Sequence, residues 1–421
     1  MLSTLRQRNF ALLWSGQIIS RMGDWVLWIA LPFYVYEKSG SALATGAMFI
    51  VTNLPPLLFA SLAGVFVDRW NRKQVMVAAD LLRALLILLL LLIRSSDYLW
   101  LLYPLAFGEA MISQFFTPAK SAILPTLVDQ RSLTAANTLI SISGDVAMLI
   151  GPACSGLLYG SLGFTGVVWI DAVSFVFSAL LIGSIQLPTE PRKKTARPVD
   201  ATHPRWMDGK KLWLEWQDGL RIVQRERTIA TLFITAGLAY IGNGIILVSW
   251  YVHVREVLGG GALEYGWIQV AVATGGILAG LGMTRLYRCF SARQLMALSG
   301  IITGFLLFAT FHLHSIPLIL FLQVLTGIAA VGFYVPMSTL LQSSTEKEFL
   351  GRIFGAFGTT CALLMLLGQG IASLFVARLG TTWMLDGAAL MALLGGVYAL
   401  RLPVSQETAT STSPPSATPP P

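Results

Sequence analysis

Apolar runs of about 20 residues recur along almost the whole chain, and each is long enough to cross a bilayer as a helix. A helix satisfies its own backbone hydrogen bonds in lipid, so these runs predict membrane-spanning helices. Only 12% of the 421 residues are charged, whereas soluble domains average about 25%. We predict an all-α integral membrane protein with twelve transmembrane helices, over residues 10–36, 44–66, 75–94, 99–120, 136–160, 165–187, 228–252, 263–285, 294–312, 316–342, 354–378 and 382–402.

The loops between these spans differ in charge from one loop to the next. Short loops rich in Lys and Arg tend to stay in the cytoplasm. With the amino end inside, most loop cations fall on the inner side, and the outer loops hold only Lys38, Arg94, Arg255 and Arg378. We therefore expect both termini to be cytoplasmic, and we attribute the net charge of +8 to loops at a lipid surface, with no nucleic-acid partner.

The longest polar segment, 188–227, divides the chain into an N-terminal half, 1–187, and a C-terminal half, 228–402. The first part of the segment is rich in Pro, Lys and Arg and is predicted to be a cytoplasmic linker. The second part places Trp residues at helical spacing beside Lys and Arg, which is typical of a helix lying in the membrane interface. The Ser-, Thr- and Pro-rich tail, 403–421, is predicted to be disordered.

The two halves repeat each other at an offset of about 215–220 residues, as expected of a transporter built from two six-helix repeats. In such transporters the substrate path runs at the interface between the repeats, near the midplane of the bilayer. The matching features are Ser41–Gly46 with Gly261–Gly266, Gly64–Arg72 with Gly280–Arg288, Pro118 with Pro336, and Asp171 with Asp386. Asp171 and Asp386 lie near the outer ends of spans six and twelve, and this position predicts helix-cap or gate contacts.

A glycine, an acid and three cations lie in the link between spans two and three. The link resembles the loop between helices 2 and 3 of the major facilitator superfamily, written G-x-x-x-D-R-x-G-R-[RK]. The resemblance implies a gating latch, in which the acid bonds a facing helix start, where the dipole is positive. Asn71 replaces a glycine and is expected to adopt a left-handed turn. A solvated basic turn is the alternative. The latch residues are Gly64, Asp68, Arg69, Arg72 and Lys73.

Further motifs resemble a bacterial branch of this superfamily that includes macrolide efflux and enterobactin-exporter proteins. They include Leu13-Trp14-Ser15-Gly16-Gln17, Gly23-Asp24, Ala30-Leu31-Pro32, Asp171-Ala172-Val173-Ser174-Phe175 and Glu215-Trp216. Ala147–Gly156 is similar to the helix 5 antiporter motif, in which Gly151, Pro152 and Gly156 would pack the two halves together. The resemblance implies the major facilitator fold in a bacterial cytoplasmic membrane, and export of drugs or metabolites driven by inward proton flow.

Charged side chains within spans are the candidates for proton coupling. Asp24 lies about 20 Å along its helix from Phe10, and a charge near mid-bilayer costs about 2.5–3.5 kcal/mol. Gln17, Arg21, Asp24 and Trp28 share one helix face. Two interpretations remain open, a local pair of Arg21 with Asp24 and a polar stripe that lines a transport cavity.

Two further acids are candidates for proton coupling. Glu109 lies in span four, which normally lines the path in this superfamily, and a buried carboxyl there could load and release a proton. A structural carboxyl held by a neighbouring helix is the alternative. The basic residue usual in helix 4 of the family is not found in this span. Asp145, at the inner end of span five, is predicted to be a gating group first and a proton site second. Asp80 and Arg83, one turn apart, predict a local ion pair near the inner face.

The second half carries few charges in the spans expected to line the path. We predict a mostly apolar, aromatic cavity suited to amphipathic or weakly cationic organic molecules. Its residues, beyond those named above, are Phe116, Tyr240, Asn243, Gln323 and Tyr334.

These features predict a monomeric secondary exporter of hydrophobic or amphipathic compounds, with protons and the lipid bilayer as its other partners. Three alternatives remain: a dedicated exporter of one metabolite such as a siderophore, a lysophospholipid transporter, and a membrane sensor that transports nothing. No cofactor is expected. The glycine-rich runs lack the Lys-Ser/Thr of a phosphate loop, and neither a metal set nor a nucleophile with its base is evident, so we do not expect an enzyme.

Overall fold

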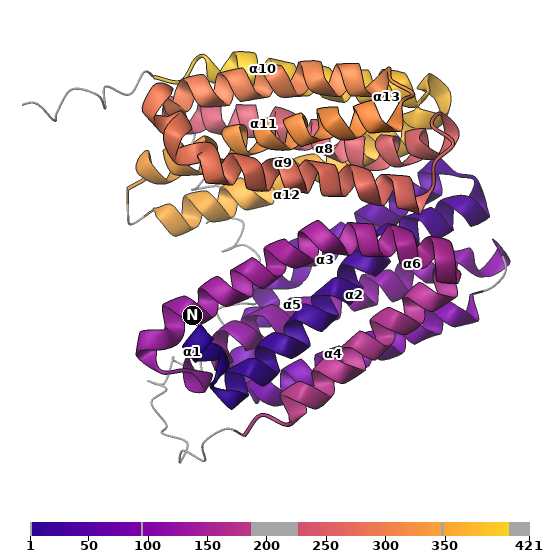
Figure 1. Ribbon diagram of the computed structural model, residues 1–421, viewed down its shortest axis with the longest axis vertical. Coiled ribbons are helices and arrows are strands. Elements are labelled where there is room, and N and C mark those ends of the chain that lie inside the picture. The colour runs from indigo at the N-terminus through magenta and orange to yellow at the C-terminus, as the bar shows by residue number, and fades with distance from the viewer. Residues whose placement is uncertain (1, 94–95, 187–225, 347–348, 404–421) are drawn as a thin grey trace, which may run out of the picture.

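The computed structural model describes residues 2–93, 96–186, 226–346 and 349–403 (Figure 1). The predicted interfacial helix and disordered tail fall outside these residues, and so do the side chains of Asp68 and Asp145. Within the described residues, twelve helical segments are long and apolar enough to cross a membrane. This confirms the predicted all-helical membrane fold.

Every described element is helical. α6 contains two spans, because its chain reverses at Gly163, which has a φ of +67°. The elements are α1 (Leu2–Leu5), α2 (Arg8–Ser39), α3 (Ala42–Arg69), α4 (Arg72–Leu89), η1 (Leu90–Leu92), η2 (Ser96–Leu101), α5 (Leu102–Leu127), η3 (Gln130–Ser132), α6 (Leu133–Gly183), α8 (Arg227–Glu256), α9 (Ala262–Cys289), α10 (Ala292–Phe311), α11 (Ile316–Ser343), α12 (Leu350–Leu379) and α13 (Thr381–Ala399).

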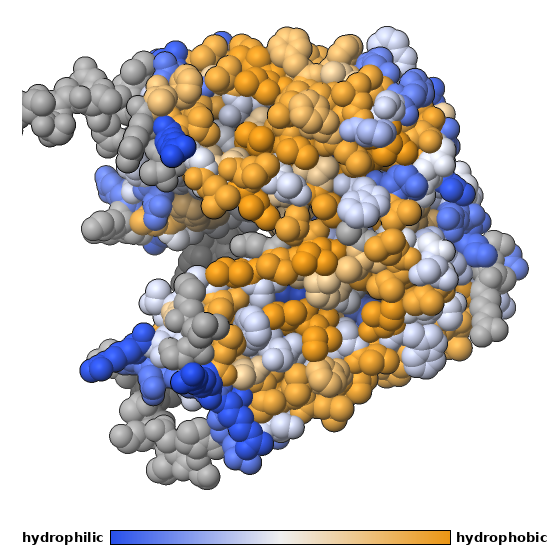
Figure 2. Space-filling model, in the orientation of Figure 1, coloured by the Kyte–Doolittle hydropathy of each residue, from blue (hydrophilic) through white to orange (hydrophobic). Residues whose placement is uncertain are grey.

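The helices form two bundles, α1–α6 and α8–α13, which meet at one end and diverge toward the other (Figure 1). The bundles pack against each other through α6 with α9 and through α3 with α12. The N-terminus lies at the diverging end (Figure 1). Figure 2 shows apolar side chains over the flanks of both bundles and a hollow between them at the same end. The molecule is therefore closed at one end and open at the other.

An aromatic cluster closes the end where the bundles meet. Phe33 of α2 and Tyr251 of α8 lie with ring centroids 3.7 Å apart, and Tyr265 of α9 is 5.1 Å from Tyr251. Phe49 of α3 also contacts Tyr251. All four side chains are buried. Because buried aromatic rings contribute large apolar contact areas, this cluster holds the two bundles together at the closed end.

The link between α3 and α4 is shorter than expected. α3 continues to Arg69, so the turn consists of Trp70 and Asn71 alone. Asn71 does not adopt the predicted left-handed conformation: its φ is −70° and its ψ is 110°. Its side chain instead accepts hydrogen bonds from the backbone N–H groups of Lys73 and Gln74. Asn71 is therefore the N-cap of α4.

Candidate functional site

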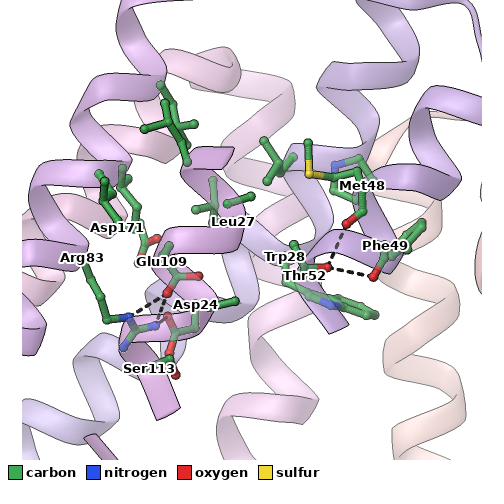
Figure 3. Close-up of a pocket in the computed structure, with 18 of the residues that line it drawn as sticks. Asp24, Leu27, Trp28, Met48, Phe49, Thr52, Arg83, Glu109, Ser113 and Asp171 are labelled. Carbon is green, nitrogen blue, oxygen red and sulfur yellow. Dashed lines mark hydrogen bonds and ion pairs between the residues drawn. The ribbon is translucent and has the colours of Figure 1, made fainter. Parts of the chain in front are cut away.

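Three charged side chains from three helices meet inside the N-terminal bundle. Arg83 Nη2, on α4, lies 2.6 Å from Oδ1 of Asp24 on α2. The same guanidinium lies 2.7 Å from Oε1 of Glu109 on α5 through Nε. The Arg83 side chain is 7% exposed, against 38% for Asp24 and 21% for Glu109. One buried cation therefore bridges two partly accessible carboxylates, as Figure 3 shows.

The packing around Arg83 holds its guanidinium in place. Its Cζ atom lies 4.0 Å from the centroid of the Phe175 ring on α6, a cation–π arrangement. Asp24, Arg83 and Glu109 line a cavity of about 240 Å³. Asp171, also on α6, lines this cavity too and is completely buried. Gly23 lets α2 approach Asp171 closely, because a Cβ at Gly23 would overlap the Asp171 carboxylate. We call Asp24, Arg83, Glu109 and Asp171 the charge site.

These contacts exclude one of the alternatives left open by the sequence and correct two expectations. The ion-pair partner of Asp24 is Arg83, and not Arg21 one turn away. Arg83 does not pair with Asp80, whose two carboxyl oxygens are buried and have no hydrogen-bond partner among the described residues. Asp171 lies at the charge site, whereas its repeat partner Asp386 lies 3.7 Å from His312, so the two acids do not make matched contacts.

A buried lysine lies on α5, although the sequence interpretation found no basic residue in that span. Lys120 is 6% exposed, and its Nζ donates a hydrogen bond of 3.3 Å to Oε1 of Gln17 on α2. Lys120 is the last residue of the predicted span, 99–120, whereas α5 continues for two more turns to Leu127. Gln17 is therefore a buried partner of Lys120. Arg21 lies over Gly144 of α6.

A second, larger cavity of about 460 Å³ lies between the bundles and extends into the C-terminal bundle. We call it the central cavity. Of the predicted cavity residues, Trp28, Asn243, Gln323 and Tyr334 line it. Gln17 and Arg21 line neither this cavity nor the one at the charge site, which corrects the prediction for both. Tyr240 lies behind Tyr334, with ring centroids 6.1 Å apart. Trp28 also lines the charge-site cavity, so one side chain contacts both cavities.

Phe116 is not among the cavity residues, which corrects the prediction. It is 5% exposed and packs in an apolar cluster of the N-terminal bundle with Phe10, Leu13 and Val67. Spacing along α5 placed Phe116 on the face of Glu109, but nearly two turns separate the two residues. Phe116 therefore lies beyond the charge site along α5, in the apolar core of the bundle.

The antiporter-like segment of α6 lies where the bundles meet. A Cβ at Gly156 would lie 2.6 Å from Cα of Leu263 and 2.9 Å from the carbonyl oxygen of Ala262, both on α9. Gly151 packs directly on the Trp25 side chain, and Pro152 lines the central cavity. The small residues of this segment therefore allow close contact with the second bundle and with a cavity wall.

Hydrogen bonds reinforce the closed end. The Tyr36 hydroxyl, on α2, donates to Glu256 at the end of α8, which joins the two bundles. The Tyr159 hydroxyl, on α6, donates to Glu37 over 2.7 Å. These pairs and the aromatic cluster of Phe33, Phe49, Tyr251 and Tyr265 form what we call the end seal.

The predicted latch residues lie at the opposite, open end. Arg69 and Arg72 are exposed, and Gly64 has open space around it. Lys73 Nζ donates a hydrogen bond of 2.8 Å to the carbonyl oxygen of Ile185, just past the end of α6. This hydrogen bond joins the turn between α3 and α4 to the end of α6 in the same N-terminal bundle.

Comparisons with known proteins place these features in context. The family described as "Transmembrane secretion effector" matches residues 1–421. Macrolide efflux protein A of Streptococcus pyogenes is 24% identical over 386 residues, which cover 90% of this chain and 92% of that protein. Multidrug efflux pump Tap of Mycolicibacterium fortuitum is 25% identical over 394 residues, covering 91% and 93% of the two chains. Both relatives align over most of their length.

Solved structures share the fold. A bacterial homologue of the iron transporter ferroportin, in an inward-facing state, superposes with a TM-score of 0.73 over 94% of this chain and 98% of that chain, at 16% identity. A bacterial homologue of the human lysosomal transporter Spinster gives a TM-score of 0.65 at 15% identity, over 94% and 95% of the chains. At these identities the likeness concerns the fold alone.

Proposed function

The chain belongs to the major facilitator superfamily, in the family described as transmembrane secretion effectors, and from this premise we propose that it exports hydrophobic or amphipathic organic compounds in exchange for protons. The family and its named relatives are transporters and not enzymes, and the resemblance inferred from the motifs is confirmed. The efflux names of relatives about 25% identical support the direction of transport. The proposed location is a bacterial cytoplasmic membrane, with the open end of the molecule toward the cytoplasm.

The proposed proton coupling rests on the charge site. Asp24, Glu109 and Arg83 together bear one excess negative charge when both acids are ionised, and a single proton removes it. An uncompensated charge in the membrane interior is costly, which favours binding of that proton. Protonation of either acid also weakens its ion pair with Arg83, because a neutral carboxyl attracts the guanidinium less strongly.

Loss of one ion pair would change how the helices are held together. Asp24 lies on α2 and Glu109 on α5, and both are joined to α4 through Arg83. α2 also carries Trp28 of the central cavity and Tyr36 of the end seal. Proton binding at Asp24 can therefore act on the cavity and on the seal through one helix. In alternating access, such a change shifts the population between states open to opposite sides.

The test is transport by the purified full chain in proteoliposomes with an imposed pH gradient. We expect Asp24→Asn and Glu109→Gln each to lower gradient-driven transport of an uncharged amphipathic dye by about tenfold or more, because each removes a protonatable group. Asp97→Asn is the control, since Asp97 is exposed in η2 and outside the charge site. Wild-type rates in both charge-site variants would refute the assignment.

A further inference from the structure

Among the described residues that line the central cavity, none is Asp, Glu, Lys, Arg or His. Its polar groups are the amides of Asn243, Gln269 and Gln323 and the hydroxyls of Thr303, Thr326 and Tyr334. The rest of the lining is apolar or aromatic, and includes Trp25, Trp28 and Trp250. Both bundles contribute to this lining, so the cavity is available to a molecule carried between them.

Several of these polar groups are available for a ligand. Each primary amide offers two N–H donors and one carbonyl acceptor. A buried polar group without a partner costs about 1–3 kcal/mol, so a passenger with matching donors and acceptors gains binding free energy here.

Three acids of the described interior line the other cavity. Asp24, Glu109 and Asp171 line the charge site, where Arg83 already bridges the first two. Trp28 forms part of the wall of both cavities, and Figure 3 shows it with Phe49 on the side of the pocket opposite Arg83. A charged passenger in the central cavity would therefore lose its hydration without gaining a counter-ion.

Burying an unpaired ion is far more costly than burying a neutral polar group that is hydrogen-bonded. A tryptophan face can attract a cation, but this contributes only about 0.5–2 kcal/mol. We propose that the central cavity is a binding site for uncharged, amphipathic molecules that carry a hydrogen-bonding group, and that it discriminates against organic ions of either sign. The acids of the charge site then serve protons and not the passenger.

The proposal concerns the passenger of the proton-coupled export proposed above, and it has an electrical consequence that rests on that function. When an uncharged molecule leaves in exchange for protons, each cycle moves net positive charge inward. An inside-negative membrane potential, which favours inward movement of cations, should then accelerate transport at a fixed pH gradient. A monovalent cation exchanged for one proton would instead move no net charge.

Two probes of one shape separate the classes. Triphenylphosphine oxide and methyltriphenylphosphonium share three phenyl rings on phosphorus, but the first is neutral with an acceptor oxygen and the second is a permanent cation. Quenching of tryptophan fluorescence in the purified full chain reports binding, because three tryptophans line the cavity. We expect the neutral probe to bind at least about tenfold more tightly than the cation. Equal affinities, tighter binding of the cation, or no binding of either probe would overturn the proposal.

A variant with an acid in the cavity provides the second measurement. Asn243→Asp supplies a counter-ion and should shift the preference toward the phosphonium by about tenfold or more. Asn137→Asp is the matched control, because Asn137 is exposed near the start of α6 and does not line the cavity. An unchanged preference in Asn243→Asp would contradict the assigned site.

The two proposals fail in different ways. If a pH gradient drives no transport while the neutral probe still binds selectively, the proton coupling is wrong and the cavity assignment stands. If transport responds to the pH gradient but the cation binds as tightly as the neutral probe, the coupling stands and the passenger class is wrong.

Discussion

Arg83 Nη2 lies 2.6 Å from Oδ1 of Asp24, although 59 residues separate the two along the chain. Each residue has an oppositely charged neighbour three positions away in sequence, Arg21 for Asp24 and Asp80 for Arg83. Arg21 does not form the ion pair with Asp24, and Asp80 does not form the ion pair with Arg83. The ion pair in the structure joins Arg83 to Asp24. The long-range pair joins α2 to α4, and with Glu109 it also joins α5. An intramembrane charge therefore connects helices here, and does not merely neutralise a neighbour on its own helix.

Asp171 and Asp386 test whether an acid must lie in the charge site to contribute to proton coupling, or whether any buried acid contributes. They are related by the internal repeat, but only Asp171 lines the charge site. We expect Asp171→Asn to lower pH-gradient-driven transport by about tenfold, because it removes a protonatable group from the charge site. Asp386→Asn should leave the rate within about twofold, since its partner is the half-exposed His312. Equal losses in the two variants would contradict this role.

Gly156 tests the contact between α6 and α9 at the closed end. Gly156→Ala would place a methyl group 2.6 Å from Cα of Leu263, so one of the two backbones must move. We expect the bundles to separate at this end and transport to fall by about tenfold. Spin labels at Lys38 and Val257, both exposed near the end seal, should report a longer distance.

Gly160→Ala is the matched control for that experiment, because it adds the same methyl group one turn further along α6. A Cβ at Gly160 meets nothing within 4 Å. Its label distance and transport rate should equal those of the wild type. A wild-type label distance in Gly156→Ala would show that the end contact tolerates a methyl group.

The hydrogen bond from Tyr36 to Glu256 predicts a specific change in the balance of states. Tyr36→Phe removes a bond across the end seal, and a hydrogen bond to a charged group contributes about 1.5–3 kcal/mol. We expect a cysteine at Asn243, in the central cavity, to react about tenfold faster with an impermeant thiol reagent added at the sealed side. Slower or unchanged labelling would exclude a sealing role for this bond.

Tyr34→Phe is its control, since the Tyr34 hydroxyl donates to the carbonyl oxygen of Ile93 within the same bundle. This variant loses a tyrosine hydroxyl two residues away but no contact between the bundles. Labelling of the cavity cysteine should stay at the wild-type rate.

The orientation in the membrane is a prediction from loop charge. In a cysteine-free background, a cysteine at Lys38 should react with an impermeant reagent added outside intact cells, whereas a cysteine at Arg72 should react only after permeabilisation. Both positions are exposed, so accessibility of the side chain does not limit either reaction. The reverse pattern would invert the protein and would place the open end outside.

Much of the architecture follows from sequence alone, because the bilayer imposes simple demands. A run of about 20 apolar residues must form a helix in lipid, and a charge within it must have a function or a partner. That reasoning identified the spans and the link at Asn71, and it predicted Asp24 and Glu109 as intramembrane acids for proton coupling. It did not identify Lys120 as a buried basic residue, because the lysine is the last residue of the predicted span 99–120, whereas the helix continues to Leu127.

Which residues meet was decided by the packing of the helices. Spacing along one helix relates residues three or four positions apart, and this is why Asp80 was expected as the partner of Arg83 and Arg21 was considered as a partner of Asp24. Only the assembled bundle brings Arg83 between Asp24 and Glu109, moves Phe116 into the core and turns Trp28 toward both cavities. The sequence alone determined that this chain spans a membrane as helices and carries charge inside it. Tertiary packing decided which charges pair and which cavity is left without any, because the distances that govern Coulomb attraction and desolvation exist only between helices.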